Sequence, residues 1–196
     1  MKKKDFPTRL DNTISSMQSA KTKKDLGEVI AGEVSRYTIQ ELQAIGGKMK
    51  IEVDKLPQPY REKVRPYFEE QIFGMYHRLL TMQRSGKLEY LREEITDRET
   101  FDKFVGMIKS GCFDEPDISG TDFYFEEPLN SFFYYLVSGF AMFVLDEPGH
   151  PVGMPFPGGF EVEKRGSDYF CPIRDKEDEV LFSICNFCPA KQMEGV

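Results

Sequence analysis

The residues with the clearest chemical potential are cysteines and a histidine near the C-terminus. Cys185 and Cys188 form a C-x2-C pair, and Cys171 precedes this pair by thirteen intervening residues. Two thiolates at such a spacing can bind one metal ion, because a tight turn directs both sulfur atoms to the same side. A tetrahedral site then needs two further ligands, and Cys171 and His150 are the nearest candidates. The sequence therefore predicts a metal site formed by His150, Cys171, Cys185 and Cys188.

Structural zinc is the metal that this set of ligands favours, since small irregular segments often use a metal in place of a core. Cys112 is a reserve ligand: with Cys112 in place of His150, the site would have four sulfurs and would also suit an iron–sulfur cluster. The function expected is a metal-stabilised binding or accessory protein. The alternatives are an iron–sulfur redox protein or a metalloenzyme whose open metal position faces residues 151–159. A further interpretation is that the thiols are simply buried in the core.

Other metal chemistry is excluded by the residues beside these candidates. A zinc deaminase needs His-x-Glu and Pro-Cys-x-x-Cys, whereas His150 is followed by Pro151 and Val152. No His-Glu-x-x-His pattern is present. The other histidine, His77, has Glu70 two helical turns before it, but such a pair arises easily by chance on a charged helix. We therefore predict no catalytic residue.

Helix signals dominate the first half of the chain. Thr22, Thr38 and Thr96 each precede an acidic residue by three positions, which is the capping-box pattern of a helix start. The pair Gly46-Gly47 is expected to end or bend the second of these helices. Apolar residues at helical spacing predict a long helix over residues 66–86, with Pro66 in its first turn. Residues 132–145 are apolar all round and predict a helix buried in the middle of the fold.

The C-terminal segment has a different pattern. Prolines and glycines between residues 148 and 159 oppose regular structure, and a short strand over residues 160–163 is expected to pair with one over residues 169–173. The predicted fold class is mainly α: six or seven helices with a small C-terminal β-hairpin and a cysteine knuckle. Residues 1–147 are expected to form the helical domain, with residues 148–196 packed on it as one compact unit.

The distribution of charged and apolar residues limits the classes of partner that the protein can bind. The formal charge is −7, with +4 in residues 1–110 and −11 in residues 111–196, so the second half repels nucleic acid. No apolar stretch follows the first charged residues, as a signal peptide would require. The longest uncharged run, residues 128–145, is shorter than the roughly 20 residues of a membrane-spanning helix. We expect a cytoplasmic protein with a protein or small-molecule partner, and neither nucleic acid nor membrane binding.

The C-terminal motifs also carry a resemblance. The stretch that begins at His150 reads HPVGMPFPGGF, and it is followed by Cys171-Pro and by Cys185-Asn-Phe-Cys188-Pro. In this combination the chain resembles a family of uncharacterised archaeal proteins found largely in methanogens. The resemblance covers about the last 50 residues and implies an archaeal source and a cytoplasmic setting. Because anaerobic archaea use many iron–sulfur proteins, it also keeps iron as an alternative metal.

Overall fold

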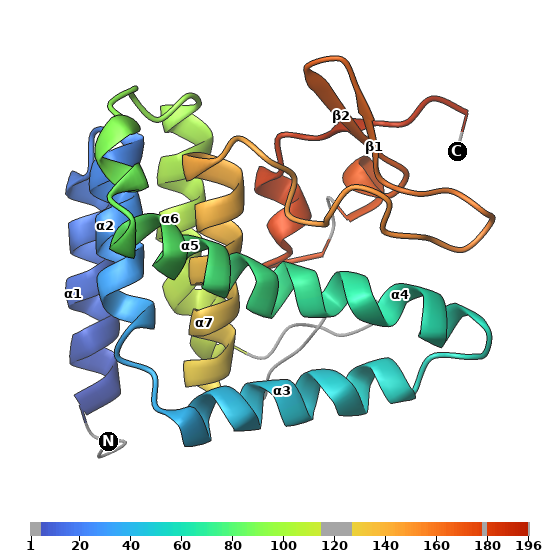
Figure 1. Ribbon diagram of the computed structural model, residues 1–196, viewed down its shortest axis with the longest axis horizontal. Coiled ribbons are helices and arrows are strands. Elements are labelled where there is room, and N and C mark those ends of the chain that lie inside the picture. The colour runs from blue at the N-terminus through green and yellow to red at the C-terminus, as the bar shows by residue number, and fades with distance from the viewer. Residues whose placement is uncertain (1–4, 115–126, 178–179, 196) are drawn as a thin grey trace.

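The computed structural model describes residues 5–114, 127–177 and 180–195 (Figure 1). The α-helices are α1 (Phe6–Ser19), α2 (Lys23–Val34), α3 (Ile39–Asp54), α4 (Tyr60–Glu69), α5 (Met75–Arg84), α6 (Arg98–Phe113) and α7 (Pro128–Gly139). Two π-helical turns extend them, η2 (Glu70–Gly74) between α4 and α5 and η4 (Phe140–Val144) after α7. In Figure 1, α1, α2, α6 and α7 run roughly vertically, whereas α3 and the α4–α5 rod cross them horizontally. The predicted fold class, mainly α with a small C-terminal sheet, is confirmed.

Two of the three predicted helix starts are confirmed, and the third lies one residue later. Thr22 caps α2 and Thr38 caps α3, each in a complete capping box. The N-cap of α6 is Asp97, whose carboxylate accepts a hydrogen bond of 3.0 Å from the backbone N–H of Thr100. Thr96, the predicted cap, instead donates its hydroxyl to Asp146, 3.0 Å away. The hydroxyl of Thr96 therefore makes a contact with a distant residue and does not cap α6.

The glycine pair does not end its helix, and Pro66 does not lie in a first turn, so these two predictions were wrong. Helix α3 continues through Gly46 and Gly47 to Asp54. A Cβ at Gly46 would lie 3.4 Å from the ring of Phe73, so the glycine allows close packing against η2. Pro66 lies inside α4 and not in its first turn, because the helix begins at Tyr60. At Gly46, packing against Phe73 outweighs the low helix propensity of glycine.

Helix α7 and η4 form the centre of the core, as their sequence predicts. Residues 131–144 are all buried. The rings of Phe104 and Phe143 lie 5.2 Å apart, and those of Tyr37 and Phe133 lie 4.9 Å apart, so rings from α6 and from the segment after α2 pack on this helix. The aromatic packing makes α7 and η4 a rigid support for the loop that follows them.

The C-terminal sheet is larger than predicted and begins later. Strands β1 (Glu163–Arg165) and β2 (Asp168–Cys171) form an antiparallel hairpin, and β3 (Lys191–Gln192) pairs with β2 in parallel. The turns η5 (Arg174–Glu177) and η6 (Ile184–Phe187) connect β2 to β3, and η3 (Lys87–Tyr90) follows α5. Val162, Cys171 and Cys188 belong to the same hydrophobic core as the helices. The division at residue 147 stays a prediction.

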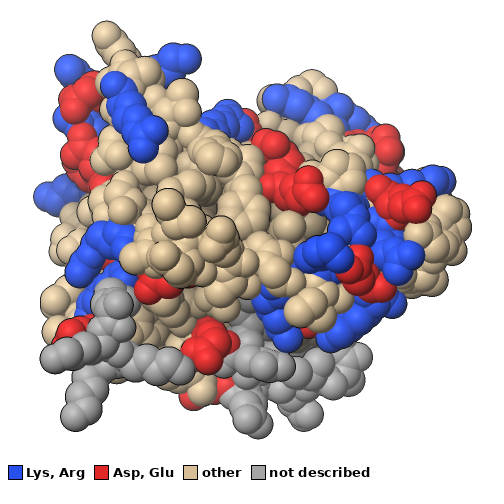
Figure 2. Space-filling view, turned by 60° about the horizontal axis from the view of Figure 1, so that its bottom comes forward, with Lys and Arg blue, Asp and Glu red and all other residues tan. Residues whose placement is uncertain are grey.

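The surface carries charges of both signs. Figure 2 shows Lys and Arg intermixed with Asp and Glu at one side of this face and a broad uncharged area at its centre. On α3, Lys48 pairs with Glu52 at 3.0 Å and Lys50 pairs with Asp54 at 2.5 Å. Across the described ranges, no helix is long and apolar enough to span a membrane. The cytoplasmic setting and the expected partners stay predictions.

Candidate functional site

The structure brings two of the predicted metal ligands close together. Cys171 ends β2 and Cys188 follows η6, and both thiols are buried. Burial raises the pKa of Cys171, and the neighbouring Cys188 raises it further. The backbone N–H of Gly149 donates to Sγ of Cys188 at 3.4 Å. Two thiols and a neighbouring backbone amide therefore meet beneath the Pro/Gly loop.

The remaining candidates do not complete a metal site. His150 is buried and lies edge-on to Phe156, with ring centroids 5.8 Å apart. Cys185 is buried in η6, and Cys112 is buried on α6. Within residues 5–114, 127–177 and 180–195, no three His, Cys, Asp or Glu side chains are grouped so that they could hold a metal. The zinc site and its iron–sulfur alternative stay predictions.

Burial keeps these thiols protonated. Burial raises the pKa of Cys171 to about 11 and raises the pKa values of Cys112 and Cys188. A thiol is a nucleophile or a metal ligand only after it loses its proton. The geometry therefore favours neutral, inert cysteines in the absence of a metal.

The Pro/Gly loop satisfies its own backbone groups. Gly153 N–H donates to the Val162 carbonyl at 2.7 Å, and Phe156 N–H donates to the Phe160 carbonyl at 2.7 Å. The hydroxyl of Tyr60 on α4 donates to the Pro155 carbonyl at 3.0 Å. These amides are consequently not available to cradle an anion, and the loop is held as a rigid crossing over α4.

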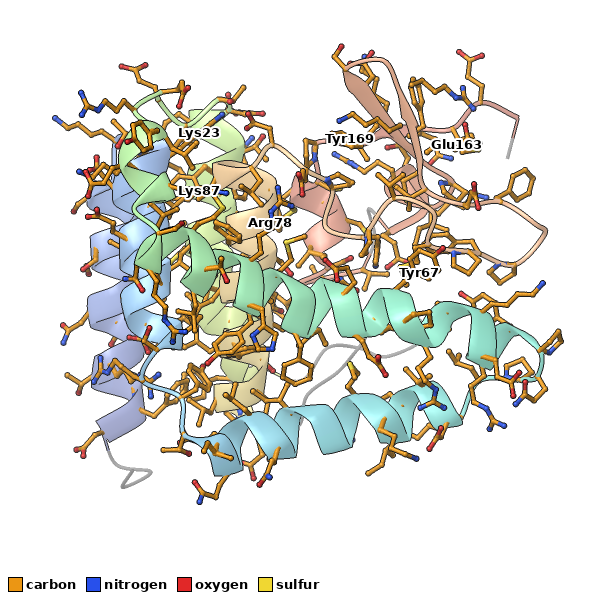
Figure 3. The ribbon with its side chains drawn as sticks, viewed as in Figure 1. Lys23, Tyr67, Arg78, Lys87, Glu163 and Tyr169 are labelled. Carbon is orange, nitrogen blue, oxygen red and sulfur yellow. The ribbon has the colours of Figure 1, made fainter. Side chains whose placement is uncertain are left out.

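A second site, which no motif of the sequence predicted, lies between the α4–α5 rod and the hairpin. This cleft has a volume of about 330 Å³ and is lined by η2 and α5, by η4 and the loop of residues 147–152, and by β1 and β2. We call it the Gln71 cleft. Figure 3 shows two of its residues, Arg78 on α5 and Tyr169 on the hairpin. Its polar side chains are Glu70, Gln71, Arg78, Glu147, Lys164 and Tyr169.

Gln71 is the most unusual residue of this cleft. Its side chain is buried, with 3% of the residue exposed, yet neither Oε1 nor Nε2 has a hydrogen-bond partner. A buried amide without partners is destabilising by about 1–3 kcal/mol. Such groups are rare in folded proteins and mark strained, functional or solvent-filled places.

Two π-helical turns position the walls of the cleft. Gln71 lies in η2, and Ala141 of η4 lines the opposite side. A π-turn inserts one residue into a helix and occurs frequently at functional sites. In η2, a Cβ at Gly74 would lie only 2.3 Å from Oε2 of Glu70, so the glycine leaves the space that this carboxylate occupies.

The mouth of the cleft carries fixed charges. Arg78 donates two hydrogen bonds to the carboxylate of Glu147, of 2.6 Å and 2.9 Å, in a bidentate ion pair. Lys164 donates to the hydroxyl of Tyr169 at 3.1 Å, and its Nζ lies 5.0 Å from the centroid of the same ring. The cleft therefore has a neutral amide at its wall and charged groups at its mouth.

A strained residue holds Glu147 in place. Asp146 has a φ of 54°, which is unusual for a residue other than glycine. Its carboxylate accepts from Lys23 on α2 and from the hydroxyl of Thr96. These contacts fix the turn after η4 and hence the backbone from which Glu147 reaches Arg78.

One signal in the sequence pointed to Gln71. It lies three residues after Phe68 and four before Met75, so it interrupts the apolar stripe of the long helix. A lone polar residue on an apolar face is a weak signal, and the other walls come from residues far away in the chain.

Comparison with known proteins gives a family and no activity. A model of the family described as "Uncharacterized protein conserved in archaea (DUF2115)" matches residues 22–193. The chain is 30% identical over 69% of its length to the UPF0305 protein MK0666 of Methanopyrus kandleri, and the match covers 86% of that protein. It is 22% identical over 87% of its length to the UPF0305 protein MJ0646 of Methanocaldococcus jannaschii, covering 96% of it. No solved structure matches significantly.

Proposed function

The chain belongs to this family of uncharacterised archaeal proteins, and we propose that it is a binding protein that holds a small molecule in the Gln71 cleft. The cleft is near the lower end of the size range of small-molecule sites, about 300 Å³. Its walls come from helical turns and a short hairpin. The amide atoms of Gln71 are covered, so a ligand reaches them only when the Gln71 side chain or its neighbours shift.

The observation that carries this proposal is the unpartnered amide of Gln71. A buried glutamine without hydrogen bonds lowers the stability of the fold, and an apolar residue at position 71 would not. A ligand that pairs with Oε1 and Nε2 supplies the missing hydrogen bonds. Function often retains residues that stability alone disfavours.

The test is a ligand screen on the full chain with a Gln71-specific readout. Amino acids, dipeptides, nucleobases, sugars and organic acids are screened by thermal shift, since a ligand that binds only the folded state raises Tm. Hits are then followed by the side-chain ¹⁵N–¹H₂ resonances of Gln71, assigned by their loss in Gln71→Met. We expect at least one compound to raise Tm and move these resonances. If no compound in the screen does both, the proposal is wrong.

The matched control is Gln83→Met, an exposed glutamine on α5 that does not line the cleft. This variant should retain the rises in Tm that the ligands cause in the wild-type chain, whereas Gln71→Met should lose them.

The proximity of Cys171 and Cys188 favours a second candidate, the structural zinc site with an iron–sulfur or catalytic metal as its alternative. A tetrahedral ion needs four donors, so this proposal requires His150 and Cys185 to supply the other two. Elemental analysis with an absorption spectrum of anaerobically purified protein tests it. About one zinc per chain, absent from a Cys185→Ser/Cys188→Ser variant, would support it; metal-free preparations would refute it.

A further inference from the structure

A second hollow, outside the Gln71 cleft, has walls of aromatic rings and prolines. It is a groove between α4 and residues 153–161, with a volume of about 730 Å³. Figure 3 shows Tyr67 on the side of α4 that faces the C-terminal loop and hairpin. We call this hollow the Tyr67 groove, and it shares no lining residue with the Gln71 cleft. Its walls include four prolines and the rings of Tyr60, Tyr67, Phe156 and Phe160.

Two of these rings are held by the backbone beside them and still present surface to a partner. A Cβ at Gly153 would lie 3.1 Å from the hydroxyl of Tyr67, and a Cβ at Gly158 would lie 3.0 Å from the ring of Phe160. Both rings therefore lie closely against a glycine. Tyr67 is half-buried and Phe160 is exposed. Rings that are fixed before binding lose little entropy when a partner arrives.

The spacing of the two tyrosines on α4 matches the repeat of a polyproline II helix. Tyr60 and Tyr67 are seven positions apart within α4, which places them on one face, about 10.5 Å apart along the helix axis. Three residues of polyproline II span about 9.3 Å, which is one turn of that helix. The two prolines of a P-x-x-P segment can therefore each contact one of the tyrosine rings.

The hydrogen-bonding groups of the groove favour an extended peptide. Among the residues that the structure describes, the hydroxyl of Tyr67 has no hydrogen-bond partner. A polyproline II segment has free carbonyls that can accept from this hydroxyl, whereas the carbonyls within an α-helix are already paired. Addition of a β-strand is disfavoured, because the N–H groups of Gly153 and Phe156 are paired within the loop. Pro155 and Pro157 have no N–H to offer.

The charges of the groove favour a basic residue beside the prolines. Its charged side chains are Glu62, Lys63 and Glu161, which sum to one negative charge. Glu161 is exposed and makes no ion pair with a residue in the described ranges. It lies at the Tyr60 end of the groove, because Pro155 forms a β-bridge with Glu161 and accepts the hydrogen bond of the Tyr60 hydroxyl. A Lys or Arg at that end of a peptide meets an opposite charge.

We infer that the Tyr67 groove binds a proline-rich segment of a partner protein in the polyproline II conformation, with a Lys or Arg at the Tyr60 end. Such segments dock in aromatic-lined grooves, and they lose little entropy because the free segment already populates this conformation. The inference goes beyond the proposed function, since it concerns a different surface and a different class of ligand.

The test measures peptide binding to the full chain by fluorescence anisotropy. The probes are the labelled heptapeptides RPLPPLP and PLPPLPR, because a polyproline II peptide can lie in either direction in a groove. Matched peptides replace every proline by alanine, or the arginine by glutamate. We expect at least one of the two probes to bind. Its alanine form should bind at least about tenfold more weakly, and its glutamate form about threefold more weakly.

Variants of the rings assign binding to the groove. Phe160→Ala should weaken peptide binding at least about fivefold, as the loss of an aromatic anchor does in other interfaces. Tyr67→Phe keeps the ring and removes the hydroxyl, so it should weaken binding about threefold. The matched controls are Phe113→Ala and Tyr90→Phe, which change exposed aromatic residues outside the groove. Both controls should bind the peptide as the wild-type chain does, and urea unfolding shows that each variant is folded.

A variant of the acidic end tests the basic residue. Glu161→Gln should remove the preference for the arginine peptide over its glutamate form. The control is Glu163→Gln, which changes a nearby carboxylate that does not line the groove. This control should keep the preference.

Three outcomes would overturn the inference: no binding of either probe, equal binding of the alanine forms, or binding that neither Phe160→Ala nor Tyr67→Phe weakens. An amphipathic helical peptide that binds more tightly than both probes, with the same dependence on Tyr67, would show that the conformation is wrong. Gln71→Met should leave peptide binding unchanged, so failure of this inference and failure of the proposed function are separate results.

Discussion

Arg78 on α5 and Glu147 after η4 form a bidentate ion pair across the mouth of the Gln71 cleft, although they are 69 positions apart in the sequence. Their side chains are 42% and 27% exposed, so water screens the interaction. The pair thus joins the long helical rod to the loop that leads into the hairpin.

The first prediction concerns this ion pair. A double-mutant cycle of Arg78→Met and Glu147→Gln should give a coupling free energy of about 0.5–1 kcal/mol at low salt. The coupling should fall at about 1 M salt, where the Debye length is about 3 Å. Urea unfolding at both salt concentrations measures it. A coupling well above 2 kcal/mol that salt does not change would contradict the exposed geometry.

The second prediction is that Gln71→Met stabilises the protein. The methionine keeps a similar volume and removes a buried amide that has no partner, so we expect the free energy of unfolding to rise by about 1–2 kcal/mol. Urea unfolding of Gln71→Met beside the exposed control Gln83→Met measures the effect. A loss of stability in Gln71→Met alone would mean that ordered water or another group already satisfies the amide.

The third prediction concerns the strained turn at Asp146. Asp146→Ala removes the carboxylate that pairs with the nearly buried Lys23, and it keeps a side chain at a φ of 54°. We expect a loss of about 1–3 kcal/mol in the free energy of unfolding.

The control for Asp146 is Asp168→Ala, whose partner Lys191 is exposed. This exposed pair should contribute only about 0–1 kcal/mol. Equal losses in the two variants would show that the contact with Lys23 is not a major stabilising interaction.

The fourth prediction is a pH dependence at the start of α6. The hydrogen bond from the backbone N–H of Thr100 lowers the pKa of Asp97 below its usual value. Because the folded-state pKa is lower than the unfolded one, the ionised cap stabilises the fold above the unfolded pKa of about 3.9. That contribution is lost as the pH falls through the folded-state pKa.

Asp97→Ala should therefore lower the free energy of unfolding by about 1 kcal/mol at pH 7 and by progressively less below about pH 4. Urea unfolding between pH 2 and pH 7 measures the difference, with the nearby exposed Glu94→Ala as the control. A constant difference at every pH would refute a role for the ionised carboxylate.

The fifth prediction concerns the thiols. Because burial raises the pKa of Cys171 to about 11, only a minute fraction is thiolate at pH 7. A thiol reagent should label the native chain slowly at pH 7, and all four cysteines should react promptly in denaturant. If one cysteine is labelled before the others, the Cys171→Ser and Cys188→Ser variants show whether it is Cys171 or Cys188. Prompt labelling of Cys171 in the native protein would contradict its burial.

The sequence alone determined the helical class and much of the chain's layout. Thr22 and Thr38 mark helix starts correctly because a capping box needs only residues three positions apart. The helix over residues 132–145 was identified because an all-apolar helix has no stable place outside a core. The family resemblance, carried by C-terminal motifs, is also confirmed.

Only the tertiary structure decided where chemistry could occur. The Gln71 cleft joins η2, the loop after η4 and the hairpin, segments that no short-range pattern relates. Asp97 caps α6 while Thr96 contacts the distant Asp146, and α3 continues through Gly46, which packs against the distant Phe73. The cysteine spacing gave a reasonable metal hypothesis, yet burial and side-chain direction depend on the whole fold. Local hydrogen bonding and periodicity are encoded within a few residues, whereas a site depends on long-range packing.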